Sequence, residues 1–253
     1  MTVGRVHVAR PWVLPVLVVA FIAMAVLAAV DALPWDRAIT RAVIDARTPT
    51  RDALARNASL LGSTKVVLAV SAALALLALR RSPRLALAIV IIAIARPLSE
   101  FALKEIVGRD RPVGNQLVNG RGPSFPSGHP YAAAASWGLL PLVVPLYTRN
   151  RVIWWASAII VWTIVLLVAA SRVWLGVHWT TDVVASVILA IIGVAIIERL
   201  LGVERTLYAG RTEGGRTQKD CMPPAPRLTA ELSDDDDQVA KPHHDSANPP
   251  ELP

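Results

Sequence analysis

Two histidines, His129 and His178, stand where polar segments meet long apolar runs, whereas the other three lie near the ends of the chain. Asp182 follows His178 by four residues, so the two side chains share a face if this segment is helical. A carboxylate in that position can hydrogen-bond one imidazole nitrogen, fix the tautomer and leave the other nitrogen as a nucleophile. Taken alone, the spacing is also explained by an aspartate that begins a helix near an interfacial histidine.

A second segment, Pro-Ser-Gly-His-Pro, begins at Pro126 and precedes an apolar run. Gly128 permits a close approach to the backbone, and Pro130 suits the first turn of a helix. We expect this segment to open a helix whose free N–H groups attract an anion, with the Ser127 hydroxyl as a further donor. His129 then stands where it can protonate a leaving oxygen. A plain turn capped by serine is the alternative interpretation.

Cations lie close to both histidines along the chain. Lys104 follows Arg84 by 20 residues, or about 30 Å of helix, which places its ammonium at the opposite boundary of a bilayer. Arg111 lies two helical turns further and points to the same side if the helix persists that far. Arginine offers a bidentate fork to phosphate and lysine a point charge, and Arg172 adds a third contact upstream of His178. Cations at helix ends also snorkel or set topology, which is the competing explanation.

Two further charges, Arg96 and Glu100, are four residues apart and fall inside an apolar run. Ionisable residues within a membrane helix are functional candidates by default. They also share a helix face with Lys104. We prefer an internal ion pair that stabilises the bundle over a catalytic role for Arg96 and Glu100.

The elements that must position these residues are membrane helices. Hydrophobic residues make up 54% of the 253-residue chain and the mean hydropathy is +0.47, too apolar for an ordinary soluble domain. A bilayer core needs about 20 apolar residues per helix. The chain has six such runs, which predict an all-α bundle of six transmembrane helices at 12–30, 60–79, 84–107, 129–147, 152–170 and 181–201.

The basic residues predict the orientation of that bundle. The connections at 80–84 and 148–151 are short and basic, and cytoplasmic loops carry this excess, so both termini are expected in the cytoplasm. The candidate site then faces the outer, periplasmic side of the plasma membrane. Outward segments are expected at 31–59, 108–128 and 171–180. The first of them has the pattern of an amphipathic helix at the interface, and we interpret its functional role as that of a solvated connector.

The chain divides into a cytoplasmic flank at 1–11, a membrane domain at 12–202 and a tail at 203–253 that is polar and rich in proline. We expect the tail to be disordered and cytoplasmic. The run Asp234–Asp237 suits a divalent cation, but such acidic tails are usually just solvated. The net charge of +7 arises from basic residues that punctuate apolar runs, which argues against a nucleic-acid partner.

Three motifs together resemble the signature of the type 2 phosphatidic acid phosphatase superfamily. They are K-x6-R-P at Lys104–Pro112, P-S-G-H at Pro126–His129 and S-R-x5-H-x3-D at Ser171–Asp182, in order and with intact spacing. The resemblance covers about residues 60–200 and is closest in layout to membrane lipid phosphatases, including bacterial phosphatidylglycerophosphate and polyprenyl diphosphate phosphatases. Soluble vanadate-dependent haloperoxidases resemble the same signature, but six spans argue against that branch. Pro130 is a small departure at an allowed helix position.

The resemblance implies a role for each motif residue. His178 attacks phosphorus to give a phosphohistidine, Asp182 orients and stabilises it, and His129 protonates the leaving oxygen and then activates water. The phosphoryl oxygens are held by Lys104, Arg111, Ser127, the Gly128 N–H and Arg172. Such sites are expected to need no metal or other cofactor.

The resemblance leaves the substrate open. We expect a polyprenyl (undecaprenyl or decaprenyl) diphosphate or monophosphate, because an outward site suits a carrier lipid of the cell wall. Phosphatidate and phosphatidylglycerophosphate would meet the same charges. A lipid phosphotransferase that uses the same histidine is a further alternative. The sequence does not address the oligomeric state.

Overall fold

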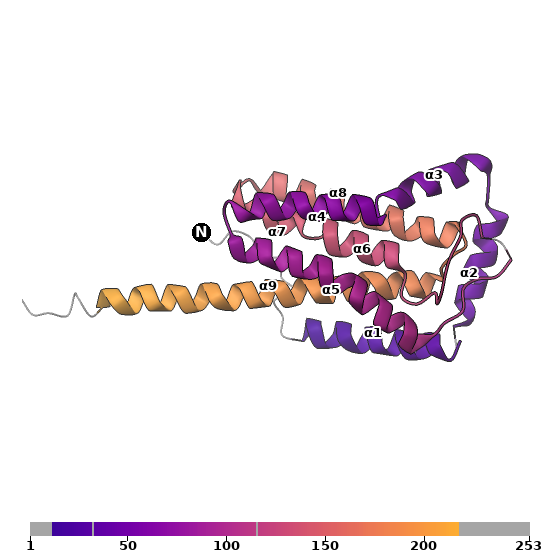
Figure 1. The fold of residues 1–253 in the computed structure, drawn as a ribbon, viewed down its shortest axis with the longest axis horizontal. Helices are drawn as coiled ribbons and strands as arrows, with labels where there is room; N and C mark the ends of the chain where they lie inside the picture. The colour runs from indigo at the N-terminus through magenta and orange to yellow at the C-terminus, as the bar shows by residue number, and fades with distance from the viewer. Residues whose placement is uncertain (1–11, 32, 115, 218–253) are drawn as a thin grey trace, which may run out of the picture. The chain divides into compact units, whose positions relative to one another are not determined.

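The computed structural model describes residues 12–31, 33–114 and 116–217. Within those ranges the regular structure is entirely helical, which confirms the predicted all-α class (Figure 1). The helices are α1 (Val13–Ala29), α2 (Pro34–Asp45), α3 (Pro49–Leu60), α4 (Thr64–Leu79), α5 (Pro83–Val107), α6 (Gly128–Trp137), α7 (Leu140–Val143), the 3-10 helix η1 (Val144–Leu146), α8 (Arg151–Trp174) and α9 (Thr180–Thr217).

Three helical segments of the described chain are long and apolar enough to cross a bilayer. They are α5, α8 and the part of α9 over Thr180–Leu200. The bent pairs α1 with α2 and α3 with α4 raise the number to five if each pair counts as one span. A multi-pass membrane protein is therefore supported, whereas the predicted number of six spans is not confirmed.

The predicted span at 129–147 is not one helix. α6 ends at Trp137, and the chain continues through the short helices α7 and η1. Pro141 and Pro145 lie in this stretch, and proline removes a backbone donor and clashes with the preceding turn, so a continuous helix is costly there. The run at 129–147 has enough apolar residues for one span, but the number of apolar residues does not distinguish one long helix from three short ones.

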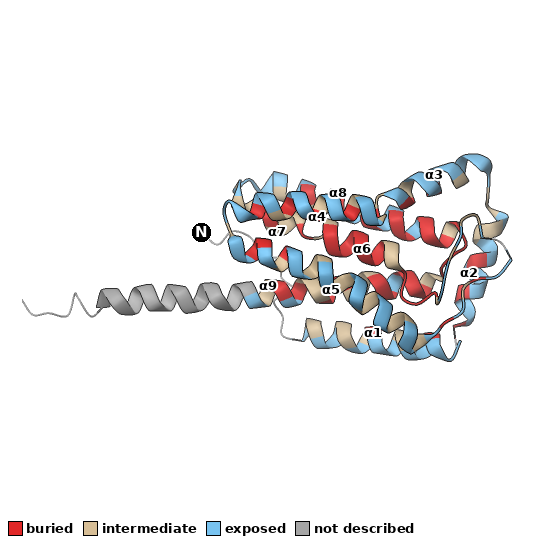
Figure 2. Ribbon diagram, in the orientation of Figure 1, coloured by how far each residue is buried: buried red, intermediate tan, exposed pale blue. Residues whose placement is uncertain are grey.

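α6 is the central helix around which the site is built. Its alanines Ala132–Ala135 are buried, and α6 contacts α4, α5 and α8. Small side chains let neighbouring helices approach closely in a membrane bundle. Figure 2 shows buried residues concentrated along α6 and exposed residues on the outer helices.

The outer surfaces of the helices are apolar. Val19 on α1, Phe101 on α5 and Ile159 on α8 expose 66%, 67% and 63% of their surface. Extended apolar faces are unfavourable in water, but they suit contact with lipid chains. This distribution of exposed side chains agrees with the membrane setting that the composition predicts.

Local capping signals set the ends of the helices that flank the site. The Ser82 hydroxyl accepts a hydrogen bond from the Leu85 N–H at 3.4 Å at the start of α5. α5 ends at Val107, and Gly108, with a φ of +62°, caps the helix in a left-handed conformation. The chain therefore leaves the helix three residues before Arg111, and the described residues 109–114 and 116–127 are irregular.

The last helix extends further than expected. α9 runs to Thr217, whereas the sixth span was predicted to end at 201 and the tail to begin at 203. Two compact units divide the chain, Met1–Ala209 and Gly210–Pro253. The flank 1–11 and the tail residues from 218 onward, including Asp234–Asp237, lie outside the described residues.

Candidate active site

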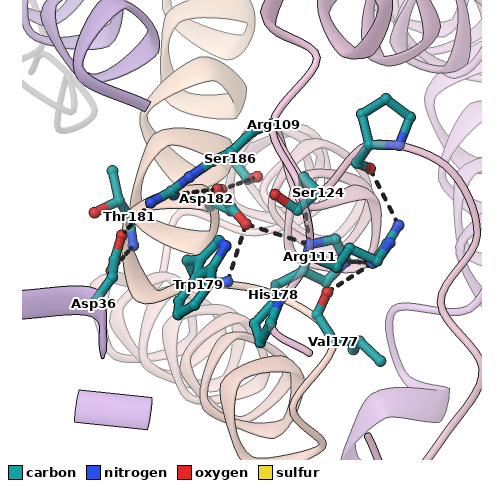
Figure 3. Close-up of polar contacts among 12 residues, drawn as sticks. Asp36, Arg109, Arg111, Ser124, Val177, His178, Trp179, Thr181, Asp182 and Ser186 are labelled. Carbon is teal, nitrogen blue, oxygen red and sulfur yellow. Dashed lines mark hydrogen bonds and ion pairs between the residues drawn. The ribbon is translucent and has the colours of Figure 1, made fainter. Parts of the chain in front are cut away.

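His178 lies in the short connection between α8 and α9, where the imidazole is 3% exposed. Its Nδ1 is 2.8 Å from the backbone carbonyl oxygen of Ser124 (Figure 3). A carbonyl only accepts hydrogen bonds, so Nδ1 carries the proton in this contact and Nε2 keeps its lone pair. The expected tautomer is thus set by the loop that follows α5.

Asp182 stands on the first turn of α9, whereas His178 precedes that helix. The shared helix face that the spacing suggested is therefore absent for these two residues. Asp182 Oδ2 is 3.7 Å from His178 Nδ1, close enough for charge attraction but too far for a hydrogen bond. The same oxygen accepts a hydrogen bond from the Trp179 N–H at 3.0 Å. The carboxylate therefore fixes the backbone beside His178 and places a negative charge next to the ring.

Burial determines the protonation state of His178. It lowers the pKa of the imidazole to about 4, although the Asp182 carboxylate acts in the opposite direction. The neighbouring Arg111 and Arg172 guanidinium groups lower the pKa further. At neutral pH the ring is neutral, which is the state that a nucleophilic nitrogen requires.

Arg111 faces the free nitrogen of His178. Its Nη1 is 3.2 Å from Nε2 and donates a hydrogen bond to the Val177 carbonyl at 2.7 Å. Three more carbonyls, of Arg121, Gly122 and Pro123, accept hydrogen bonds from the same guanidinium. The helix does not persist as far as Arg111, since α5 ends at Val107, so a shared helix side does not place Arg111 beside Lys104. The carbonyls of the loop instead hold the guanidinium rigidly beside Nε2, where a phosphoryl group would be attacked.

Arg172 reaches the site from the last turn of α8. Its Nη1 donates to the Ser59 hydroxyl at 2.7 Å, and the residue is buried. Among the described residues, its Nε has no hydrogen-bond partner although the atom is buried. An unsatisfied buried donor is costly unless a ligand completes it. An anion between Arg111 and Arg172 would supply that partner.

Lys104 is paired with a carboxylate in this structure. Its Nζ lies 2.7 Å from Glu100 Oε1, and Arg96 Nη1 lies 2.8 Å from the other oxygen of Glu100. The expected ion pair of Arg96 and Glu100 is confirmed, with Lys104 as a third member. A side chain on Gly128 would meet the Glu100 carboxylate and displace it, so glycine at the start of α6 leaves room for this ion pair.

The P-S-G-H segment opens a helix as expected, because α6 begins at Gly128. Ser127 makes no side-chain cap to this helix, which contradicts the plain capped turn. Within the described part of the chain, its buried hydroxyl has no hydrogen-bond partner. The Ser127 N–H donates to the Asp182 carbonyl at 3.3 Å, which joins the start of α6 to the start of α9.

His129 completes the group on the α6 side. Electrostatic interactions connect it with Arg172, His178 and Lys104, and Arg111 interacts in the same way with Asp182 and Glu100. The six ionisable residues among those predicted therefore belong to one electrostatically connected cluster. Ser127 adjoins it through its hydrogen bond to Asp182, and Gly128 lies beside the Glu100 carboxylate. Cations, free donors and a neutral imidazole in one place suit the binding and transfer of a phosphoryl group.

Two cavities accompany this cluster. One of about 680 Å³ borders Arg111 and the loop residues Asp110–Gly114, on the side of the molecule predicted to face outward. Another, about 770 Å³ and mainly apolar, lies among α6, α7, α8 and α9 and contains Trp154, Trp162 and Glu198 in its wall. No predicted site residue lines the apolar cavity, so chemistry is assigned to the polar cluster.

Four buried residues contribute to the site without having been predicted as part of it. Ser124 provides the carbonyl for His178, Ser59 holds Arg172, and Arg109 binds Asp182 and Asp36 at 2.7 and 2.9 Å. Arg109 lies inside the first motif, K-x6-R-P, but no role was predicted for it from the sequence. Asp36 and Ser59 lie in the segment interpreted as a solvated connector, and that interpretation was wrong for both. Ser59 is buried where α3 packs against α8, and Asp36 is buried against Arg109 and Thr181. Local sequence reveals neither contact.

Comparisons with known proteins agree with this geometry. A model of the PAP2 superfamily matches residues 84–204, a range that contains all three motifs. A crystal structure of a transmembrane PAP2 type phosphatidylglycerolphosphate phosphatase from Bacillus subtilis has a TM-score of 0.68 at 25% identity. The match covers 74% of this chain and 94% of that one.

A second crystal structure, that of LpxE from Aquifex aeolicus, gives a TM-score of 0.49 at 22% identity and covers 63% of this chain and 92% of that one. A search of the curated proteins gave no match. The family model, the similar Bacillus subtilis fold and the three motifs agree with one another. Residues 84–204, which carry all three motifs, therefore match the PAP2 superfamily, as the motifs predicted.

Proposed function

We propose that this protein hydrolyses a lipid phosphate or diphosphate through a phosphohistidine formed at Nε2 of His178. The observation that carries the proposal is the environment of the imidazole. Nδ1 donates a hydrogen bond to the Ser124 carbonyl at 2.8 Å, and Nε2 lies 3.2 Å from Nη1 of Arg111. This places an unprotonated nitrogen next to a cation that attracts phosphate.

The chemistry then follows in two steps. Nε2 attacks phosphorus and the bond to the leaving oxygen breaks, while His129 gives that oxygen a proton. Arg111, Arg172 and the Ser127 hydroxyl hold the phosphoryl oxygens as charge spreads over them. In the second step His129 takes a proton from water, the water oxygen attacks phosphorus, and the N–P bond breaks to release phosphate and free His178.

Lys104 has to change partners during this cycle. In the structure it binds Glu100 at 2.7 Å, and a phosphate in the site would compete for the same ammonium. The Asp182 carboxylate stabilises the imidazole when phosphorylation makes it positive. The cations Lys104, Arg111 and Arg172 provide the charge stabilisation that a metal supplies in other phosphatases. We therefore expect activity without added metal.

We propose a polyprenyl diphosphate or monophosphate as the substrate, with the site at the outer face of the plasma membrane and both termini in the cytoplasm. The basic connections at 80–84 and 148–151 support this orientation. An outward site suits a carrier lipid that has delivered its cargo across the membrane.

Phosphatidylglycerophosphate is the second candidate substrate. The similar Bacillus subtilis structure is that of a phosphatidylglycerolphosphate phosphatase, which favours it over other phospholipids. Phosphatidate would meet the same cations, and transfer of the phosphoryl group to an alcohol would use the same histidine.

Phosphate release by the purified full-length protein in detergent tests these assignments. The panel is undecaprenyl diphosphate, undecaprenyl phosphate, phosphatidylglycerophosphate and phosphatidate, each with and without glycerol as acceptor. We expect the highest kcat/KM on a polyprenyl substrate, free phosphate as the product, and full activity in EDTA. A preference for phosphatidylglycerophosphate would replace the proposed substrate, and phosphoglycerol as the main product would indicate a transferase.

The variant His178→Ala is the control for the nucleophile. We expect its phosphate release to fall to the background of the assay, because the covalent step has no other acceptor. A variant that folds and retains substantial activity would exclude His178 from this role.

A further inference from the structure

Asp36 stands on the first turn of α2, and it lies outside the three motifs and outside the range matched by the family model. It is only 1% exposed. Its Oδ1 accepts the Thr181 N–H at 3.0 Å and its Oδ2 accepts Arg109 Nη2 at 2.9 Å. Both oxygens of this carboxylate are therefore bound to groups that adjoin Asp182 (Figure 3).

Arg109 joins this carboxylate to the site. Its Nη1 donates to Asp182 Oδ1 at 2.7 Å, while Nη2 binds Asp36. The guanidinium lies 5.4 Å from the centre of the Trp179 ring. Asp31, which is about half exposed, lies 3.8 Å from the same Nη2 and is a weaker contact. The buried part of the group is thus a chain of carboxylate, guanidinium and carboxylate that ends next to His178.

The charges of this chain explain why a second carboxylate is useful. Two buried carboxylates share one guanidinium, so a negative charge remains for the positive imidazole that forms during phosphoryl transfer. Without Asp36, the guanidinium would be free to pair fully with Asp182 and weaken the attraction between Asp182 and the ring. The Thr181 N–H would also lose its acceptor, and with it the fixed start of α9.

We infer that Asp36 is a positioning residue for the catalytic carboxylate: through Arg109 and the Thr181 N–H it keeps Asp182 in place and electrostatically available to His178. This inference rests on the proposed function of His178 and Asp182. It assigns α2, a helix that carries none of the family motifs, to the active site.

The variant Asp36→Asn tests the inference, because it removes the charge and preserves the size. We expect kcat on the preferred lipid to fall by about tenfold to a hundredfold, the range seen when outer contacts of a functional site are removed, with KM within about threefold. The matched control is Asp52→Asn. Asp52 lies in the neighbouring α3 and accepts the Trp174 indole N–H at 2.8 Å, and we expect its kcat to stay within about twofold of wild type.

A double-mutant cycle separates positioning from general stability. If Asp36 acts through Asp182, the variant with both Asp36→Asn and Asp182→Asn should be no slower than Asp182→Asn alone. Multiplicative losses, or a kcat for Asp36→Asn equal to that of Asp52→Asn, would overturn the inference. Should Asp36→Asn fail to fold, Arg109→Lys replaces it in the same cycle, since lysine keeps the charge but lacks the fork that holds two carboxylates.

Binding of orthovanadate provides a readout that does not depend on the lipid. Vanadate adopts the geometry of phosphoryl transfer and needs Nε2 correctly aimed, so we expect Asp36→Asn to weaken its binding at least fivefold and Asp52→Asn to leave it unchanged. Equal affinities in all three proteins would contradict a positioning role. A wild type that binds vanadate but releases phosphate from no lipid would instead contradict the proposed substrate class and leave the role of Asp36 standing.

Discussion

The three motif segments and the α2–α3 pair form the same site but differ in what their sequences reveal. In the motif segments, residue type and spacing indicate the chemistry directly, and the structure gathers those residues around His178. In α2 and α3 the polar residues look like those of any surface connector. Yet Asp36 and Ser59 are buried, and they bind Arg109 and Arg172. The comparison teaches that residues proposed to touch the phosphate can be read from the motifs, whereas some of the residues that hold them in place, such as Asp36 and Ser59, come from outside the motifs.

The largest effect on kcat is expected from a substitution in the motif segments. Asp182→Asn keeps the size of the side chain, replaces one accepting oxygen with an N–H donor and removes the charge that faces the imidazole. We expect kcat to fall about ten-thousandfold, the loss that follows removal of the carboxylate charge in a histidine–aspartate relay. Steady-state kinetics on the preferred lipid measures it. A loss smaller than that of Asp36→Asn would reverse the proposed order of importance.

Arg172→Lys should produce the next largest effect. The buried guanidinium has a free Nε and a second nitrogen bound to Ser59, and lysine cannot reproduce this planar arrangement. We expect kcat/KM to fall about a hundredfold, because a preorganised contact to the phosphoryl oxygens is lost. Retention of wild-type kcat/KM would remove Arg172 from the phosphate site.

Ser59→Ala examines the α3 side of the same contact. The hydrogen bond of 2.7 Å to Arg172 disappears, while the guanidinium itself remains. We expect kcat/KM to fall about tenfold, since one hydrogen bond to a charged group is worth about 1.5–3 kcal/mol. Ser71→Ala is the matched control, because the Ser71 hydroxyl bonds Ser136 at 3.1 Å in the buried bundle. Equal kinetics for the two variants would show that α3 contributes only stability.

The smallest change is expected in the dependence on pH. Burial lowers the pKa of His178 to about 4, so the ring stays neutral as pH falls from 7 to 5. We expect the part of kcat/KM that follows the ionisation of His178 to change less than about twofold over that interval and to fall tenfold per pH unit below about 4. Titration of the substrate and of His129 is measured separately. A midpoint near 6.5 would show that His178 is more accessible to water than its surroundings indicate.

The same contrast explains which features the sequence predicts. Lys104, Arg111, His129 and His178 follow from motif spacing, because their roles need particular chemical groups. The partner of His178 Nδ1 does not, since any residue can supply a backbone carbonyl and Ser124 supplies it only after the loop folds.

The boundaries of the helices are also predicted only in part from the sequence. Apolar runs predicted α5 and α8 closely, because one helix accounts for each run. The run at 129–147 was predicted as a single span, whereas prolines divide it. The burial of Asp36 depends on the distant residues Arg109 and Thr181, so no local pattern around Asp36 reveals it.

The covalent step at His178 is tested most directly by trapping the phosphoenzyme. His129→Ala, which lacks the group proposed to activate water, is mixed with a lipid diphosphate that carries a labelled terminal phosphate, because its phosphate leaving group can depart without a proton donor. The reaction is quenched at alkaline pH, where phosphohistidine survives. The account predicts stoichiometric label on the peptide that contains His178, with phosphorus on Nε2, and no label in the variant that also carries His178→Ala. Label on another residue, or rapid phosphate release with no protein-bound label, would contradict it.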